Sequence, residues 1–218
     1  MGTDSEVQTP DGGHLWAERR GAGRPVVLLH GSGMDSRLWD AVAPELSRHH
    51  DVIRYDARGL GRSAPPERTF DDVEDLRAVL DHFGLDRAAL VGLSMGGETA
   101  LDFTLAHPER VTALALVGAS VSGHDWPPSP ETSACAEARR QGDATALADL
   151  ELSVWAALGH TAPGGGLIET MVRENATRRI TSEHHLPGAH HHVLPNADHY
   201  LPLRTPDQLT ALLLAHLA

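Results

Sequence analysis

The sequence predicts an α/β fold in which a mostly parallel, doubly wound sheet carries helices on both faces. Continuous apolar runs at residues 25–29, 88–93 and 111–117 are typical of strands that are buried on both sides. Amphipathic helical patterns separate these runs, so strands and helices alternate along the chain. Glycine-rich segments follow the first two runs, where the chain must turn sharply into the next element.

The first half of the chain supplies most of the elements. Two short strands around Pro10-Asp11-Gly12-Gly13 predict an edge hairpin, because Asp-Gly and Gly-Gly dipeptides accommodate positive φ. The spacing of apolar residues then predicts, in order, strand 25–29, helix 38–47, strand 52–55, a turn-rich loop 56–68, helix 73–83, strand 88–93, helix 96–107 and buried strand 111–117.

The second half departs from this alternation. Between residues 120 and 175 a Pro-rich opening leads into helical patterns, which three glycines at 164–166 interrupt. Such helices indicate either a lid over a substrate pocket or ordinary helical packing on the sheet. We expect a core of residues 1–119 and 176–218 with a helical lid, 120–175, inserted in it. A short strand at 191–194 and a C-terminal helix complete the core, and the apolar face of this helix is formed by Leu209, Leu212, Leu213 and Leu217.

Length and charge narrow the possible functions. A chain of 218 residues is long enough for one domain with a sizeable core. The net charge of −12 and the lack of long basic runs argue against nucleic acid or an anionic membrane as partner and favour a small-molecule substrate. All 18 basic residues are arginine, which excludes a lysine Schiff base, a pyridoxal-phosphate lysine and a Walker-type phosphate lysine.

Cysteine usage and hydropathy predict a cytoplasmic location. Cys135 is the single cysteine, so an internal disulfide and a thiolate metal cluster are excluded and a reducing compartment is expected. The N-terminus is polar and acidic, and no apolar run is long enough to span a bilayer.

The segment Gly92-Leu93-Ser94-Met95-Gly96 has the pattern of a nucleophile elbow. A serine hydroxyl becomes a useful nucleophile when a sharp turn from strand to helix holds it exposed beside a base. Gly92 and Gly96 leave room where the strand and helix backbones approach each other. A Gly-x-Ser-x-Gly match can arise by coincidence, but here the predicted strand, turn and helix are all present.

Four segments together make the chain resemble the α/β-hydrolase superfamily over its whole length. They follow successive strands in the expected order: His30-Gly31-Ser32-Gly33, the loop from Asp56 to Ser63, the Ser94 elbow, and Asn196-Ala197-Asp198-His199. The resemblance implies an enzyme without cofactor or metal that cleaves a small carboxylic ester, lactone or related acyl bond through an acyl-enzyme intermediate.

The resemblance also implies roles for individual residues. Ser94 is the expected nucleophile, and His199 is the expected base that deprotonates it and later protonates the leaving group. The backbone N–H groups of Ser32 and Met95 are expected to form the oxyanion hole. The residues from Asp56 to Ser63 are assigned to support, with Asp56 and Arg58 holding neighbouring loops by hydrogen bonds.

The chain departs from the family pattern at the acid of the triad. The family usually places an aspartate after a further parallel strand between the lid and the histidine, and residues 175–190 contain no apolar strand run. We therefore expect a sheet that is one strand short. Asp125 is the best substitute, because some superfamily members carry the acid after the preceding strand. Asp198 adjoins His199 but points elsewhere in most backbone geometries, and the lid acids Glu131, Glu137 and Asp149 are expected to be solvated.

Three alternatives remain open. A relative that lost its acid would be a weak or inactive hydrolase, or a binding protein. A dinucleotide-binding oxidoreductase is suggested by Gly31-Ser32-Gly33 and Asp56, although Ser36 stands where the third glycine belongs. A metal site is suggested by histidines 184, 185 and 190–192, but adjacent histidines on a strand point to opposite faces, so exposed surface is the preferred interpretation.

Overall fold

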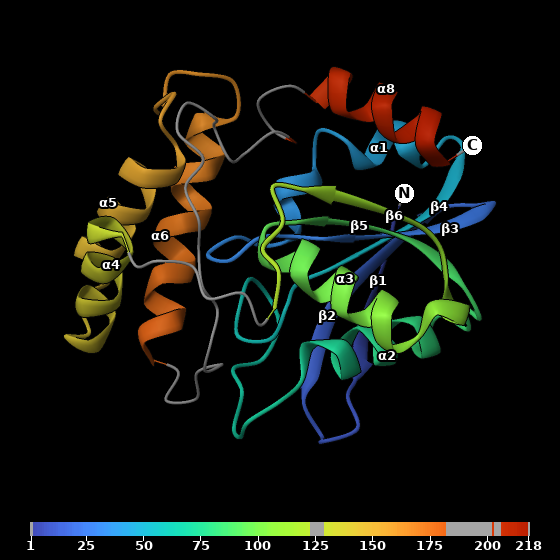
Figure 1. Cartoon of the computed structure of the whole chain (residues 1–218), viewed down its shortest axis with the longest axis horizontal. Helices are drawn as coiled ribbons and strands as arrows, with labels where there is room; N and C mark the ends of the chain where they lie inside the picture. Colours follow the sequence, from blue (N-terminus) through green and yellow to red (C-terminus); the bar gives the residue numbers. More distant parts are fainter. Residues whose placement is uncertain (1, 123–128, 182–201, 203–205, 218) are drawn as a thin grey trace.

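A six-stranded sheet forms the centre of the protein (Figure 1). The computed structural model describes residues 2–122, 129–181, 202 and 206–217. The strand order is β1-β2-β4-β3-β5-β6; β3, β4, β5 and β6 run parallel, and β1 and β2 add an antiparallel hairpin at one edge. The predicted mostly parallel α/β fold is confirmed. The strands are β1 Thr3–Gln8, β2 His14–Gly21, β3 Arg24–Leu29, β4 His50–Tyr55, β5 Ala88–Leu93 and β6 Val111–Val117.

Helices cover both faces of the sheet, and a separate helical group lies at its carboxyl edge. In Figure 1, α1 and α8 lie above the sheet and α2 and α3 lie below it. Helices α4, α5 and α6, which we name the lid helices because they fall largely within the predicted lid, stand at the side where the parallel strands end (Figure 1). This is the side where α/β enzymes bind ligands. The helical elements are η1 Ser36–Trp39, α1 Ala43–Leu46, α2 Asp72–His82, α3 Met95–Ala106, η2 Pro108–Arg110, α4 Pro130–Arg140, α5 Ala144–Trp155, α6 Gly165–Thr181 and α8 Pro206–Leu217.

Alternate residues of one strand supply two hydrophobic cores. Val26 and Leu28 of β3 point into the core that contains η1, α1, α8 and the lid helices, whereas Val27 and Leu29 point into the core beneath α2 and α3. All four side chains are buried, so both faces of this strand are covered. This explains why residues 25–29 read as a continuous apolar run rather than an alternating one.

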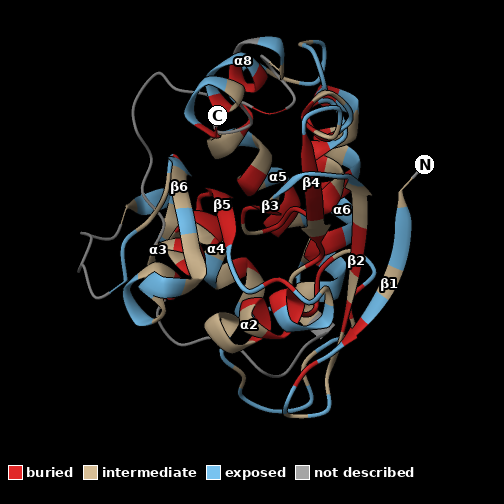
Figure 2. Cartoon of the chain, turned by 90° about the vertical axis from the view of Figure 1, so that its right-hand side faces the viewer, coloured by how far each residue is buried: buried red, intermediate tan, exposed pale blue. Residues whose placement is uncertain are grey.

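β6 forms the predicted strand but is less buried than predicted. Of its seven residues only Val117 is buried, and Leu116 is 43% exposed. Figure 2 shows the contrast with β5, which is buried along its length. The reason is position, because β6 is the last strand of the described sheet and pairs on one side with β5. The strand predicted at 191–194 lies outside the described residues, so the prediction of a missing strand is not tested.

Two further predictions need correction. The helix predicted at 38–47 is split into η1 and α1, because the chain turns at Asp40 and Pro44 in the first turn of α1 lacks the N–H needed to continue a helix. Helix α6 runs unbroken to Thr181, past the predicted end of the lid at residue 175, and the division into core and lid stays a prediction. On α8, Leu209, Leu213 and Leu217 are buried as predicted, but Leu212 is 69% exposed.

The first turn of α2 makes stability depend on pH. Burial, with the nearby charges of Asp75 and Asp71, raises the pKa of Asp72 to about 7. A raised pKa favours the protonated folded form, so this contribution to stability is complete below about pH 4 and is lost as the pH rises through about 7. We expect Asp72→Asn to increase the free energy of unfolding by about 1 kcal/mol at about pH 8 and by less at about pH 5.

Urea unfolding at both pH values checks this prediction. Asp86→Asn is the matched control, because Asp86 is also acidic and is exposed on the loop that follows α2. It removes the same charge from a protein of net charge −12. An equal gain for both variants at both pH values would contradict the specific role of Asp72.

Candidate active site

Ser94 has a strained backbone at the junction of β5 and α3. Its φ is 54° and its ψ is −119°, and within the described part of the chain it is the one non-glycine residue with positive φ. Its N–H donates to the carbonyl of Val117 (3.0 Å), and its own carbonyl accepts from the N–H groups of Gly97 and Glu98 (2.9 and 3.0 Å). Such strain costs about 1–3 kcal/mol and concentrates at functional sites. The local fold therefore holds Ser94 in a fixed, sharp turn.

Three glycines make this turn sterically possible. A Cβ atom on Gly92 would lie 2.3 Å from the carbonyl oxygen of Gly96, and one on Gly96 would lie 2.5 Å from the carbonyl oxygen of His30. A Cβ on Gly97 would lie 2.5 Å from the Cβ of Ala119. Each distance is far below van der Waals contact. The prediction that Gly92 and Gly96 provide room for close backbone approach is confirmed.

The segment after β3, residues 30–35, lies directly against Ser94; we call it the β3 loop. A Cβ on Gly31 would be 3.3 Å from the Cβ of Ser94. The N–H of Met34 donates to the carbonyl of Gly31 (3.2 Å), which closes a turn around Ser32 and Gly33. Met95 is the first residue of α3, so its N–H has no acceptor within the helix. The backbone segments of Ser32 and Met95 thus flank the serine.

The segment after β4, residues 56–63, supports the β3 loop. The Nε2 atom of His30 accepts from the N–H of Ala57 (2.9 Å), which leaves Nδ1 to donate to the carbonyl of Gly31 (2.8 Å). Asp56 is fully buried and accepts from the N–H of Ser36 (2.8 Å). The predicted supporting role of this segment is confirmed. A buried Asp56 bound within the protein is also not placed to hold a ribose, which argues against the dinucleotide alternative.

Helix α6 reaches the same loops through one buried amide. Asn175 is fully buried; its Oδ1 accepts from the N–H of Gly61 (2.9 Å) and its Nδ2 donates to Oδ2 of Asp35 (3.1 Å). Burial acts to raise the pKa of Asp35, but hydrogen bonds from Arg37 and Asn175 outweigh it and lower the pKa to about 2. Asp35 is therefore an ionised acceptor at neutral pH.

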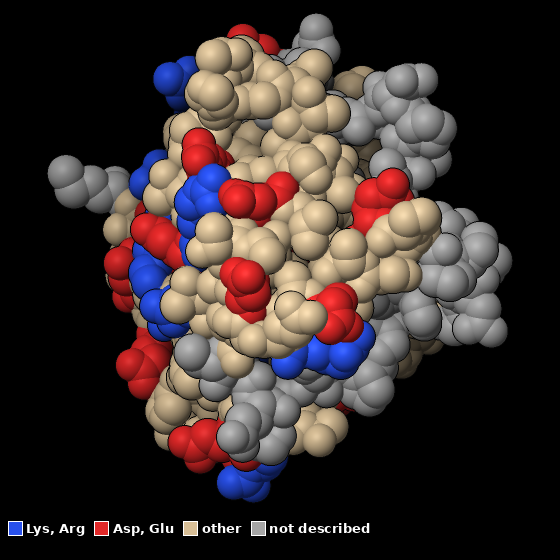
Figure 3. Space-filling view, turned by 90° about the vertical axis from the view of Figure 1, so that its left-hand side faces the viewer, with Lys and Arg blue, Asp and Glu red and all other residues tan. Residues whose placement is uncertain are grey.

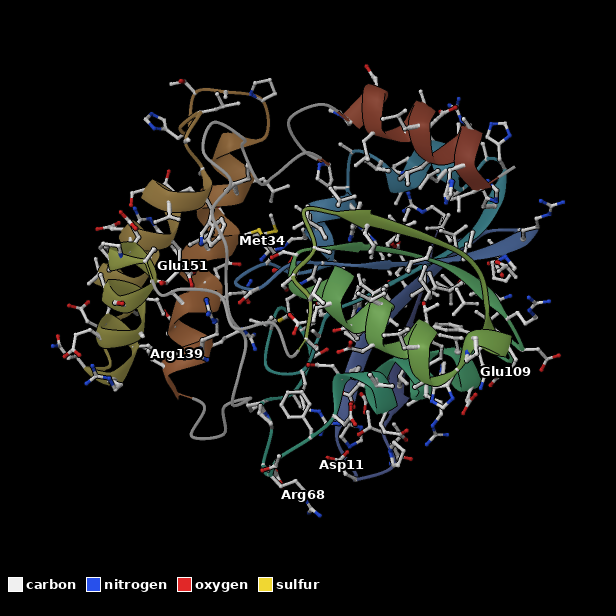
Figure 4. All side chains as sticks on the ribbon, in the orientation of Figure 1. Asp11, Met34, Arg68, Glu109, Arg139 and Glu151 are labelled. Atoms are coloured by element: carbon white, nitrogen blue, oxygen red, sulfur yellow. The ribbon has the colours of Figure 1, made fainter. Side chains whose placement is uncertain are left out.

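A second contact between lid and β3 loop involves a buried ion pair. Glu151 of α5 and Arg179 of α6 pair with each other, and each side chain is 11% exposed. A Cβ on Gly33 would lie 3.0 Å from Oε2 of Glu151 and 3.2 Å from Nη1 of Arg179. Burial and the charge of Arg179 lower the pKa of the adjacent Arg139 to about 10. Figure 4 shows Glu151 and Arg139 among the lid helices, with Met34 at the boundary between lid and sheet.

Two predicted catalytic residues, Asp125 and His199, lie outside the described residues. The loop that leads from β6 toward Asp125 starts beside the helix of the nucleophile, because the Oγ of Ser120 donates to Oε2 of Glu98 on α3 (2.5 Å). Their roles, like those of Ser94, Ser32 and Met95, stay predictions. The histidines considered as metal ligands lie outside the described residues as well.

Sequence reasoning missed the contacts made by Asp35, Asn175, Glu151 and Arg179. A weak local signal existed for Asp35, because an aspartate before Ser36 is a typical helix cap and Asp35 accepts from the N–H of Arg37 (3.0 Å). A second signal was the position of Asn175 on the apolar face of α6. The buried residues Ile168, Met171, Val172 and Ala176 share this face at helical spacing.

The described residues contain no candidate metal site and no candidate membrane span. No group of three or more His, Cys, Asp or Glu side chains within them is arranged to hold a metal ion. None of the helices in this part of the chain is long and apolar enough to cross a bilayer. The lid face in Figure 3 carries acidic and basic side chains in mixture, so this face offers no continuous basic surface for nucleic acid.

Comparison with known proteins decides the family. A family model described as the alpha/beta hydrolase fold matches residues 24–148. The chain belongs to this α/β-hydrolase family. The match includes β3, β4, β5, β6 and the Ser94 turn, which are the elements that build the site.

Two relatives of the chain are hydrolases by name. A 2-hydroxy-6-oxo-2,4-heptadienoate hydrolase of Pseudomonas putida is 45% identical over 106 residues, which cover 45% of this chain and 38% of the relative. A 2-hydroxy-6-oxononadienedioate/2-hydroxy-6-oxononatrienedioate hydrolase of Paraburkholderia phymatum is 40% identical over 115 residues, covering 47% and 39%. The chain thus matches about two fifths of the length of these relatives.

Solved structures share the fold over nearly the whole chain. Carboxylesterase CesB of Bacillus subtilis superimposes with a TM-score of 0.80 at 19% identity, covering 100% of this chain and 92% of that one. An enol-lactonase of Burkholderia xenovorans superimposes with a TM-score of 0.78 at 20% identity, covering 98% of this chain and 99% of that one. At these identities the likeness shows the fold and leaves the substrate open.

Proposed function

We propose that this α/β hydrolase cleaves a small carboxylic ester, lactone or related acyl bond through an acyl-enzyme intermediate on Ser94. The observation that carries the proposal is the strained turn at Ser94, with Gly31 packed against its Cβ. A positive φ at a non-glycine residue is retained only where the surrounding structure enforces it. The β3 loop and the start of α3 are then adjacent to one reacting carbonyl.

In this proposal Ser94 Oγ attacks the carbonyl carbon while His199 accepts its proton. The carbonyl oxygen becomes an oxyanion, stabilised by the N–H groups of Ser32 and Met95; one such donor contributes about 3–4 kcal/mol. Collapse breaks the bond to the leaving group, which takes the proton from His199. Water, deprotonated by His199, then attacks the acyl-enzyme and releases the acid and Ser94.

Asp125 is the proposed acid that orients His199. Its support is the start of its loop, where Ser120 is tied to Glu98 beside the nucleophile helix. Without any carboxylate at the histidine, turnover would fall by about 10⁴. An impaired or inactive hydrolase is therefore the alternative that the test below must distinguish.

The comparisons favour a small organic substrate. The named relatives act on 2-hydroxy-6-oxo-dienoates, and the solved structures include a carboxylesterase and an enol-lactonase. Hydrolysis of a 2-hydroxy-6-oxo-dienoate is the second candidate, favoured by the sequence relatives. In both cases we propose that residues 120–175, together with the rest of α6, form the lid of the substrate pocket. The single Cys135 supports the proposed cytoplasmic location.

Labelling with a fluorophosphonate probe tests the proposal. We expect stoichiometric phosphonylation of the wild-type protein, with mass spectrometry placing the adduct on Ser94, and no adduct in Ser94→Ala. The labelled protein should lose its turnover of short-chain p-nitrophenyl esters. Wild-type protein that reacts no faster than Ser94→Ala would leave only the inactive alternative.

A further inference from the structure

We infer that the lid positions the oxyanion loop: Asn175 and the Glu151–Arg179 ion pair hold the β3 loop at the place where its Ser32 N–H serves the reaction. The inference rests on the proposed function, because it assigns the lid a task in that chemistry. It is carried by two separate contacts between lid and β3 loop, one at Asp35 and one at Gly33.

Both contacts come from one face of α6. Asn175 and Arg179 are four residues apart, so their side chains lie above one another on the helix. The same face carries the buried apolar residues Met171, Val172 and Ala176, which fix the helix in the core. The two polar contacts therefore cannot shift independently of each other or of the core packing.

The amide of Asn175 meets two opposite requirements at once. The N–H of Gly61 needs an acceptor, and the ionised carboxylate of Asp35 needs a donor. An amide is a neutral side chain that supplies both from a single group. Because Asn175 is fully buried, loss of either bond would leave a polar atom without water to replace its partner.

Asp35, which Asn175 holds in place, in turn fixes the position of the turn beside the nucleophile. Its carboxylate caps η1 through the N–H of Arg37 (3.0 Å), and the preceding residue, Met34, closes the turn with Gly31. Ser32 and Gly33 are the two residues inside this turn. A displacement of Asp35 therefore moves the segment that carries the Ser32 N–H.

The Glu151–Arg179 ion pair restricts the movement of the β3 loop from the other side. Gly33 has φ 73°, and a Cβ there would be within 3.0 Å of Oε2 of Glu151 and 3.2 Å of Nη1 of Arg179. Little free space remains between the pair and the backbone of Gly33. The turn is thus held between Ser94 on one side and the lid ion pair on the other.

The electrostatic surroundings of Asp35 provide a sharp test. Arg37 on η1 and His30 at the end of β3 face Asp35. The lid contributes Asn175 directly and Glu174 through Arg37. The segment after β4, residues 56–63, contributes the buried Asp56, next to Gly61. In Asn175→Asp, a second carboxyl group would stand about 3 Å from Asp35, and the repulsion between two such carboxylates raises the pKa of one of them, so that both ionise only at high pH. At low pH the new carboxylic acid donates to Asp35 as the amide does; at high pH the two groups repel each other.

The experiment compares kcat and KM of wild type, Asn175→Ala and Asn175→Asp for a p-nitrophenyl ester between about pH 5.5 and about pH 8.5. We expect Asn175→Ala to lower kcat by about 10²-fold at every pH with little change in KM. Asn175→Asp should match it at high pH and regain part of the wild-type kcat at low pH. Unchanged kcat in Asn175→Ala, or an Asn175→Asp profile parallel to that of Asn175→Ala, would overturn the inference.

Ile168→Ala is the matched control, because Ile168 is buried on the same helix face two turns away. It should reduce thermal stability without the selective loss of kcat. Amide hydrogen exchange of residues 31–36 gives a readout independent of catalysis. Faster exchange there in Asn175→Ala but not in Ile168→Ala shows that Asn175 holds the β3 loop, whatever the result of fluorophosphonate labelling, and equal exchange in both overturns the inference.

Discussion

Replacing Ser94 by alanine is expected to lower kcat for ester hydrolysis by about 10⁵-fold, because no other group can form the acyl-enzyme. The fold should be unaffected, since the hydrogen bonds that hold the Ser94 turn within the described residues join backbone groups. Steady-state kinetics and a thermal melt measure the two effects separately. A variant with substantial remaining turnover would show that the hydrolysis does not use Ser94.

Ser94→Gly separates the chemical role of this residue from its conformational strain. Glycine adopts φ 54° without the penalty that a Cβ atom brings, whereas alanine retains the penalty. We therefore expect Ser94→Gly to be as inactive as Ser94→Ala but more stable by about 1 kcal/mol. If Ser94→Gly were the less stable of the two, the turn would not be strained.

The fold was predictable where burial leaves a direct imprint on the sequence. β3 and β5 are covered on both faces, so each reads as one apolar run and each was predicted to within a residue. β6 has the same kind of sequence, and the prediction of its position was correct, but its burial was not. An apolar run predicts which residues form a strand. It does not predict whether a neighbouring element covers the outer edge of that strand.

The site was predictable only in its local part. The Ser94 turn joins a strand to a helix without interruption, so one short motif contains every residue that shapes it. The bond between Asn175 and Asp35 joins residues 140 positions apart, and no spacing rule links them. Asn175 is also polar on an apolar helix face. Its hydrogen bonds to Asp35 and Gly61 explain why a polar residue stands there.

Arg58 is expected to have the largest effect on stability: Arg58→Ala should lower the free energy of unfolding by about 3–5 kcal/mol. Its side chain is 4% exposed and its Nε donates to Oδ2 of Asp75 (3.0 Å). Its remaining nitrogens bind Asp11 Oδ2 (2.7 Å) and Thr9 Oγ1 (3.0 Å). One guanidinium thus joins the segment after β4 to the β1–β2 turn and to α2. This agrees with the supporting role predicted for Arg58.

Arg77→Ala on α2, the helix that carries Asp75, is the matched control. Arg77 also pairs with two acids, Glu74 and Asp81, but the three side chains are 33%, 44% and 47% exposed to solvent. Exposed pairs contribute about 0.5 kcal/mol or less. In urea unfolding, Arg58→Ala should therefore lose several times more free energy of unfolding than Arg77→Ala. Equal losses in the two variants would contradict the importance of burial.

The pH dependence of the Arg58→Ala deficit identifies its cause. Burial already raises the pKa of Asp75, with Arg58 acting against this rise, so removing the guanidinium raises that pKa further. A raised pKa favours the protonated folded form, and the variant loses stability as the pH rises through it. The deficit should thus be larger at about pH 8 than at about pH 5, and Arg58→Ala combined with Asp75→Asn should remove this difference. A deficit that is independent of pH would instead indicate lost packing against Phe70, whose ring centroid lies 4.7 Å from the guanidinium carbon.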